Sequence, residues 1–163
     1  MHIAVILFTI FAAWRWGDWK NWRKYQSTML FIIVGVLIYL YIYKNKSLWD
    51  LGNHIFGATL TELLYAFIVL PLTVLLLLTD YPDSFKGQLY RIGKFMVIYS
   101  IMELIYWKTG FIDYDNGWNI WLSIGWNCMM FPLLVLHYKK PLYAYLVSAV
   151  GLTIFLHLFP VKM

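Results

Sequence analysis

Six apolar runs divide the chain and constrain its fold more than any other feature of the sequence. They cover residues 2–16, 27–43, 58–79, 88–108, 117–138 and 141–159. Most are close to the ~20 residues that a helix needs to cross ~30 Å of hydrocarbon. A chain of 163 residues that is 62% hydrophobic cannot bury this much apolar surface inside one small soluble domain. We therefore predict an all-α fold, an integral membrane bundle of six transmembrane helices that forms a single domain over residues 1–163.

The first run, residues 2–16, is the shortest, and a bundle of five spans is the alternative. Basic residues follow this run instead of preceding it, and no small-residue cleavage site appears, so we expect a helix and not a signal peptide. With six spans, nine of the thirteen Lys and Arg residues fall in or beside the first, third and fifth connections: Arg15, Lys20, Arg23, Lys24, Lys86, Arg91, Lys94, Lys139 and Lys140. The positive-inside rule then predicts that both termini lie outside and these connections lie in the cytoplasm.

The first connection alternates basic residues with four tryptophans. Tryptophan prefers the headgroup level and basic side chains are attracted to anionic lipids, so we expect this segment at the membrane surface. The residues expected to contact lipid headgroups are Arg15, Lys20, Arg23, Lys24, Lys139 and Lys140. Nucleic-acid binding is the alternative, but such residues beside a transmembrane run are typical membrane anchors. The expected partners are therefore a lipid bilayer with anionic lipids and no nucleic acid, with a homo-oligomer or a larger membrane complex left open.

Polar residues inside the fourth and fifth runs are the strongest candidates for a functional site. Asn119, Ser123 and Asn127 recur every four residues, so on a helix they would share one face. Glu103 lies across the short acidic turn that joins the two runs. Ionisable side chains in hydrocarbon are costly and usually face a bundle interior or a wet cavity, where burial favours the neutral acid. We predict that these four residues line a pocket in the outer half of the membrane that binds a proton, a cation or a small polar ligand.

Glu62 and His157 are weaker candidates for the same site. Both fall near the outer ends of their runs, and His157 would pair with Glu103 or Glu62; His54 lies in an outer connection. Glu62 is equally explained as a carboxylate near the positive end of a helix dipole, and His157 as a headgroup anchor. For Glu103 and the polar face, the alternative is interhelical packing through hydrogen bonds.

No motif identifies a cofactor or a catalytic centre. The turn at Asp113–Gly117 resembles the start of a calcium loop, but its glycine arrives one place early and Ile124 stands where glutamate is required. The common metalloprotease, hydrolase and nucleotide-binding signatures are absent. The single cysteine, Cys128, allows no disulfide within the chain and no cysteine-based metal site. We assign no cofactor, metal ligand or catalytic residue.

Two longer segments carry a resemblance to a known family. These are WRWGDWKNW near the start and DNGWNIWLSIGWNCMMFPLLVLHYKKP, with Glu103, the NGW turn at Asn116–Trp118 and MFPLLxLHYKKP at Met130–Pro141 as the most distinctive pieces. In these segments the chain resembles an uncharacterised family of small multi-pass membrane proteins from spore-forming Gram-positive bacteria. The resemblance covers nearly the whole chain. It implies a bacterial plasma membrane or spore membrane location and no particular activity.

Three functional hypotheses follow from these features. The first is a membrane protein with a polar outer pocket that binds a proton, cation or small polar ligand for transport or sensing. The second is an accessory or structural subunit of a larger envelope complex, in which the polar face holds helices together. The third is an intramembrane enzyme acting on lipid, with a Glu/His pair as acid and base, although no recognised signature supports it. We prefer the first because polar groups in hydrocarbon need a reason to be there.

Overall fold

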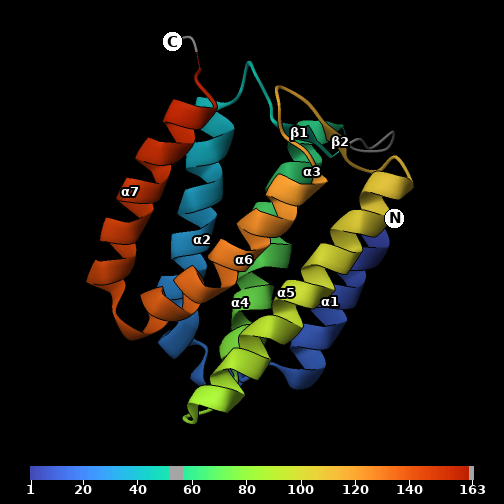
Figure 1. Ribbon diagram of the computed structural model, residues 1–163. Helices are drawn as coiled ribbons and strands as arrows, with labels where there is room; N and C mark the ends of the chain where they lie inside the picture. The colour runs from blue at the N-terminus through green and yellow to red at the C-terminus, as the bar shows by residue number, and fades with distance from the viewer. Residues whose placement is uncertain (52–56, 162–163) are drawn as a thin grey trace.

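The computed structural model describes residues 1–51 and 57–161, so His54 lies outside the described residues. Within this part of the chain six helices form a bundle (Figure 1). Five are single α-helices: α1 His2–Trp16, α2 Arg23–Ile42, α5 Phe85–Lys108, α6 Ile120–Lys139 and α7 Pro141–Leu158. The remaining helix runs from α3 Ala58–Leu64 through the π-helical segment η2 Tyr65–Val69 into α4 Leu70–Leu78. The predicted helical class is confirmed, and the predicted runs match the helices to within a few residues.

Three short elements lie between the helices. A 3-10 turn, η1 Trp19–Asn21, connects α1 to α2. Two antiparallel strands, β1 Trp49–Asp50 and β2 Asp113–Tyr114, pair Trp49 with Tyr114 and Asp50 with Asp113. Residues far apart in the sequence are thereby joined: the connection after α2 is fixed to the connection between α5 and α6. The sequence analysis did not predict this strand pair.

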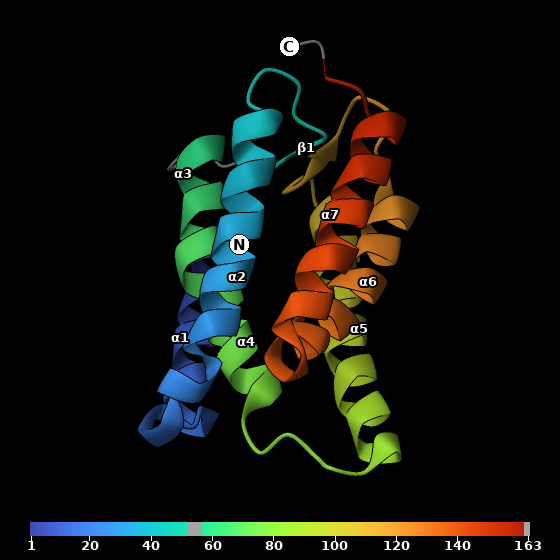
Figure 2. The same cartoon turned by 90° about the vertical axis from the view of Figure 1, so that its left-hand side faces the viewer.

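Consecutive helices run in opposite directions, as Figures 1 and 2 show. One end of the bundle, here called the strand end, holds β1, β2 and the C-terminal end of α7. The other end, here called the basic end, holds the connections from α1 to α2, from α4 to α5 and from α6 to α7. The six residues expected at lipid headgroups lie on these connections or on the helix ends beside them.

The third helix contains a π-helical segment because of its proline. Pro71 lacks a backbone N–H, and its ring would clash with the carbonyl of Phe67, four residues earlier. Phe67 lies within η2, where the wider turn separates that carbonyl from the proline ring. The helix therefore continues from α3 into α4 without a break, and α4 reaches the centre of the bundle.

The main hydrophobic core surrounds α4. Val74, Leu75 and Leu77 are fully buried there, and Phe131 and Leu134 of α6 pack against them. Helices α1, α2 and α5 pack around the same helix. Because α4 is enclosed by its neighbours, the outer helices must present their own apolar side chains to the surroundings.

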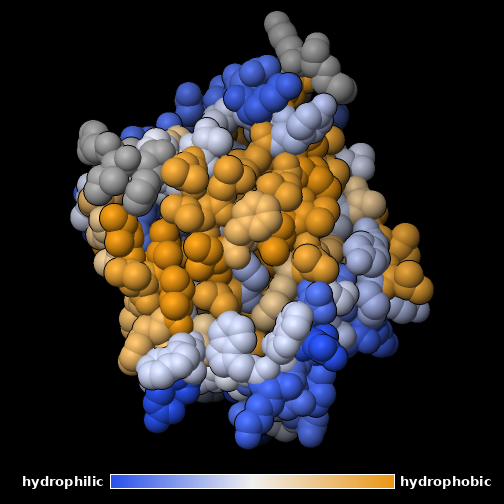
Figure 3. Space-filling model, turned by 180° about the vertical axis from the view of Figure 1, so that it is seen from behind, coloured by the Kyte–Doolittle hydropathy of each residue, from blue (hydrophilic) through white to orange (hydrophobic). Residues whose placement is uncertain are grey.

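Among the described residues, four helices are long and apolar enough to cross a membrane: Arg23–Ile42, Ala58–Leu78, Ile120–Lys139 and Pro141–Leu158. Helix α1 is shorter, and α5 is long but carries Arg91, Lys94 and Glu103 within its predicted span. The face of the molecule seen in Figure 3 is hydrophobic through its middle and hydrophilic toward both ends. Such a broad exposed apolar surface is unusual for a protein surrounded by water.

Candidate polar site around Glu103

Glu103 of α5 is bound by side chains from two other elements. Its Oε2 accepts a hydrogen bond from Nδ2 of Asn127 on α6, at 2.9 Å. Its Oε1 accepts a hydrogen bond from the hydroxyl of Tyr114 on β2, at 3.1 Å. Glu103 is half-buried and Asn127 is buried, so α5 and α6 do bring these two side chains together between them.

Ser123 and Trp118 extend this cluster toward the strand end. The Trp118 indole N–H donates a 2.7 Å hydrogen bond to the Ser123 hydroxyl, and both side chains are buried. Ser123 also lies within hydrogen-bonding reach of the Glu103 carboxyl. One face of α6 therefore presents Ser123 and Asn127 toward α5, as their four-residue spacing predicted.

Asn119 does not belong to that face. It is exposed and caps the N-terminus of α6, where its Oδ1 accepts hydrogen bonds from the backbone N–H groups of Trp121 and Leu122. Asparagine is among the preferred N-cap residues because its side chain satisfies N–H groups that the first helical turn leaves unpaired. The structure therefore places Asn119 apart from Ser123 and Asn127: α6 begins at Ile120, three residues after the start of the predicted run, and Asn119 caps it.

Tyr114 is the member of the cluster that the sequence analysis missed. Burial raises the pKa of its hydroxyl, so this group stays protonated and remains a hydrogen-bond donor. Its strand partner Trp49 stacks on Tyr39 of α2, with ring centroids 4.1 Å apart, and also contacts Trp118. A layer of aromatic rings thus covers the Glu103 cluster at the strand end. The only signal in the sequence was the position of Tyr114 in the short turn between the two candidate helices.

Glu62 and His157 lie outside the cluster. Glu62 is half-buried on α3, near the carboxylate of Asp50. His157 is exposed on α7. Among the described residues, no hydrogen bond joins His157 to Glu62 or Glu103, so the expected carboxylate–histidine pair is not formed there.

Two further buried polar clusters were not expected. His137 of α6 is only 1% exposed, and its ring nitrogens contact Thr28 of α2 at 3.0 Å and Tyr145 of α7 at 3.2 Å. Near the strand end, the Tyr65 hydroxyl lies 3.1 Å from Nδ1 of His2 and 2.6 Å from the Tyr106 hydroxyl. These contacts connect α2 with α6 and α7, and α1 with α3–α4 and α5. Both clusters depend on residues too far apart in the sequence for any local pattern to reveal.

The basic side chains predicted at lipid headgroups are either paired with neighbouring side chains or exposed. Lys139 donates a 2.8 Å hydrogen bond to Gln88 of α5 and lies over the ring of Tyr81, and Lys140 lies over the ring of Tyr143. Arg15, Lys20, Arg23 and Lys24 are exposed. Within residues 1–51 and 57–161, no group of three or more His, Cys, Asp or Glu side chains is arranged to hold a metal ion.

Comparisons with known proteins found no matching family model, no similar curated protein and no similar solved structure.

Proposed function

We propose that this chain is an integral membrane protein whose Glu103 carboxylate binds a proton or a small cation, in transport or in sensing. The membrane location is supported by the four long apolar helices and the exposed hydrophobic middle of the bundle. The alternating directions of the six helices favour six spans, with α1 as the shortest of them and α5 as the least apolar.

The orientation follows the basic residues. We assign the basic end to the cytoplasm and the strand end to the outside, because nine of thirteen Lys and Arg residues fall in or beside the connections of the basic end. On this assignment both chain termini lie outside, and Glu103 lies in the outer half of the membrane. The resemblance to membrane proteins of spore-forming bacteria would make that membrane a bacterial plasma membrane or spore membrane.

One observation carries the proposal: among the described residues, the Glu103 carboxyl is contacted by neutral polar side chains and by no cation. Tyr114 and Asn127 each supply one hydrogen bond, and none of the described Lys or Arg residues acts on this carboxyl. An isolated carboxylate in hydrocarbon is costly, and a proton or a bound cation removes that cost. The two hydrogen bonds orient the carboxyl without neutralising it.

The geometry favours a proton over a larger ligand. Two surface grooves formed by the described residues lie elsewhere, and neither is lined by Glu103. Both carboxyl oxygens already accept hydrogen bonds, so a small organic molecule would have to displace Tyr114 or Asn127. A proton needs only one lone pair of either oxygen and no additional space.

Infrared difference spectroscopy tests this proposal. The purified protein, reconstituted in lipid vesicles, is compared between alkaline and acidic buffer, and the stretching band of a protonated carboxyl group should appear on acidification. Glu103→Gln should remove one component of this band while leaving helix content and membrane insertion unchanged. Glu62→Gln is the matched control and should leave that component in place. An unchanged band in Glu103→Gln would disprove proton binding at this residue.

An accessory role in a larger membrane complex is the second candidate, and the exposure of α7 favours it. Only 6% of the apolar window of α7 is buried, against 44% in the helix Ala58–Leu78. Helix α7 packs mainly on α6 and leaves Leu142, Leu146 and Val150 exposed. A partner helix seated there should co-purify with the chain after mild detergent extraction, and Leu146→Arg should release it.

A further inference from the structure

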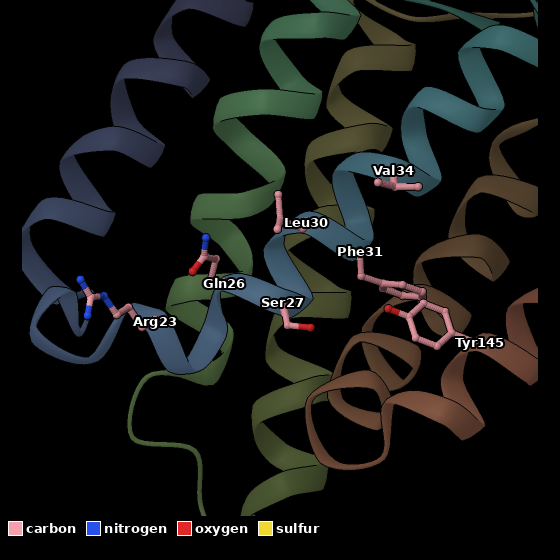
Figure 4. A pocket seen from close by; sticks show the side chains of 7 residues that line it. All are labelled: Arg23, Gln26, Ser27, Leu30, Phe31, Val34 and Tyr145. Carbon is pink, nitrogen blue, oxygen red and sulfur yellow. The ribbon is translucent and has the colours of Figure 1, made fainter.

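A groove of about 420 Å³ follows the outer face of α2 and ends against Tyr145 of α7. Its α2 residues are spaced by three and four positions, so they form one stripe of the helix. The polar members Arg23, Gln26 and Ser27 come first. The apolar members Leu30, Phe31 and Val34 follow. Figure 4 shows this order along the helix, with the rings of Phe31 and Tyr145 beside each other.

The polar half of the groove has hydrogen-bond donors that are not bonded to any described residue. Arg23, Gln26 and Ser27 are exposed, and none of them makes a hydrogen bond or an ion pair with any described residue. A guanidinium, an amide and a hydroxyl together offer several N–H and O–H groups, which suit the oxygens of a phosphate. No carboxylate lines the groove. The local charge therefore favours an anion.

A second groove at the same end has different chemistry. It is lined by the carboxylates of Asp18, Asp80 and Asp83 as well as by Lys24 and Lys139. These opposite charges compensate one another, so this second groove does not select an anion. The contrast separates the α2 groove from the general basic character of the basic end.

The apolar half of the groove has a preformed wall. Phe31 stacks on His137, with ring centroids 4.2 Å apart, and meets the edge of the Tyr145 ring at 5.6 Å. Hydrogen-bond contacts from His137 to Thr28 and Tyr145 hold that histidine in place. A wall fixed in this way loses little conformational entropy when an apolar chain packs against it.

The length of the groove fits one leaflet of a membrane. Arg23 and Val34 are separated by eleven residues, or about 16 Å along the helix at 1.5 Å per residue. Half of a ~30 Å hydrocarbon core is ~15 Å. The polar half lies toward the basic end, at the level expected for headgroups on the proposed orientation. The apolar half then lies at the level of the acyl chains.

We propose that this groove binds one anionic phospholipid of the leaflet at the basic end, an inference that rests on the proposed membrane location. The phosphate is bound by Arg23, Gln26 and Ser27. An acyl chain lies along Leu30, Phe31 and Val34 and against Tyr145.

Native mass spectrometry of the purified full chain in detergent tests this site. The chain is titrated with phosphatidylglycerol or with phosphatidylcholine, and the affinity for the first bound lipid is measured. Arg23→Gln should weaken phosphatidylglycerol binding about fivefold, which is the usual effect of one basic side chain near an anionic lipid. Leu30→Trp should also weaken it by filling the groove. The matched control Lys86→Gln removes an exposed charge at the same end outside the groove and should leave binding unchanged.

Three results would overturn the lipid site. Equal losses in Lys86→Gln and Arg23→Gln would indicate diffuse charge attraction, and equal affinities for the two lipids would exclude anion recognition. A dimer that persists when lipid is added, and that Leu30→Trp dissociates, would identify a second copy of the chain as the occupant of the groove. Carbonate extraction of the wild-type chain from membranes keeps the two proposals separate. A chain that washes off the membrane contradicts the proposed function, whereas a retained chain with no lipid preference contradicts only the groove.

Discussion

At the scale of single residues, the Glu103 cluster combines a carboxyl group with neutral donors from different elements. Asn127 approaches from the neighbouring helix α6, and Tyr114 from the strand pair that closes the strand end. A hydrogen bond to an ionised carboxylate is stronger than the same bond to a neutral carboxyl group. Ionisation of Glu103 would therefore strengthen the attachment of β2 to the bundle, and protonation would weaken it.

Tyr114→Phe isolates the hydrogen bond to Glu103. The substitution keeps the ring and removes only the donor, so we expect the free energy of unfolding to fall by about 1 to 3 kcal/mol. Thermal unfolding in detergent measures this loss. Tyr90→Phe is the control, because Tyr90 is 76% exposed and should tolerate the change. In the Glu103→Gln background the effect of Tyr114→Phe should be smaller; equal effects in both backgrounds would show that the two side chains are not coupled.

At the scale of elements, the connection between α1 and α2 is an ordered structure and not a loose basic segment. The Asp18 carboxylate accepts hydrogen bonds from the backbone N–H and side chain of Asn21 and from the Tyr25 hydroxyl. The Asp18 backbone N–H donates to the Thr79 hydroxyl at the end of α4. The Trp19 indole N–H donates to the Ala13 carbonyl. The connection thereby fixes α1 and α2 to the central helix.

Asp18→Asn should destabilise the chain in a pH-dependent manner. The hydrogen bonds from Asn21, with that from Tyr25, hold the pKa of the Asp18 carboxyl below its usual value. A lowered folded-state pKa contributes stability above the unfolded-state pKa of about 4, and that stability is lost as the pH falls through the folded-state value. We therefore expect a lower Tm for Asp18→Asn at neutral pH and a shrinking difference as the pH falls below about 4.

Asp83→Asn is the control for this pH series, because Asp83 is exposed and its side chain makes no hydrogen bond with a described residue. Its Tm should follow that of the wild-type chain at every pH. A difference between Asp18→Asn and wild type that stays constant from neutral to acidic pH would contradict the assigned role of the charge.

At the scale of the whole molecule, burial falls from the centre of the bundle to its edge. The share of buried residues is 44% in the helix Ala58–Leu78, 11% in α2 and 6% in α7. The apolar side chains of α2 and α7 are thus available to lipid or to another apolar partner. In water they would be an aggregation hazard, which is the reason why a bilayer suits the molecule as a whole.

The proposed orientation predicts opposite labelling of the two ends. Cys128 is the only cysteine, so Cys128→Ser provides a background for single cysteines. In intact cells, a thiol reagent that does not cross membranes should label Asn45→Cys at the strand end and should not label Asp83→Cys at the basic end until the cells are permeabilised. Both positions are exposed. Labelling of both cysteines in intact cells would contradict a membrane-spanning bundle, and the reverse pattern would invert its orientation.

The part of the candidate site that was predictable is the part that lies on helices. Ser123 and Asn127 face α5 as their spacing requires, and a short connection brought Glu103 onto the neighbouring antiparallel helix. Asn119 lies apart from that face because α6 begins at Ile120, three residues after the start of the predicted run 117–138, so Asn119 caps the helix and is not part of it. Helix boundaries depend on such capping competition and are poorly defined by periodicity.

The amino-acid sequence by itself determined the number, extent and alternation of the apolar helices, because backbone hydrogen bonding and transfer out of water act on each segment separately. Only the tertiary structure decided which polar groups meet. It brought Tyr114 to Glu103, buried His137 between α2 and α7, and left His157 exposed. These contacts depend on the rotation of each helix about its axis and on how β1 pairs with β2. Both are set by packing between segments distant in the chain, which no local pattern of residues encodes.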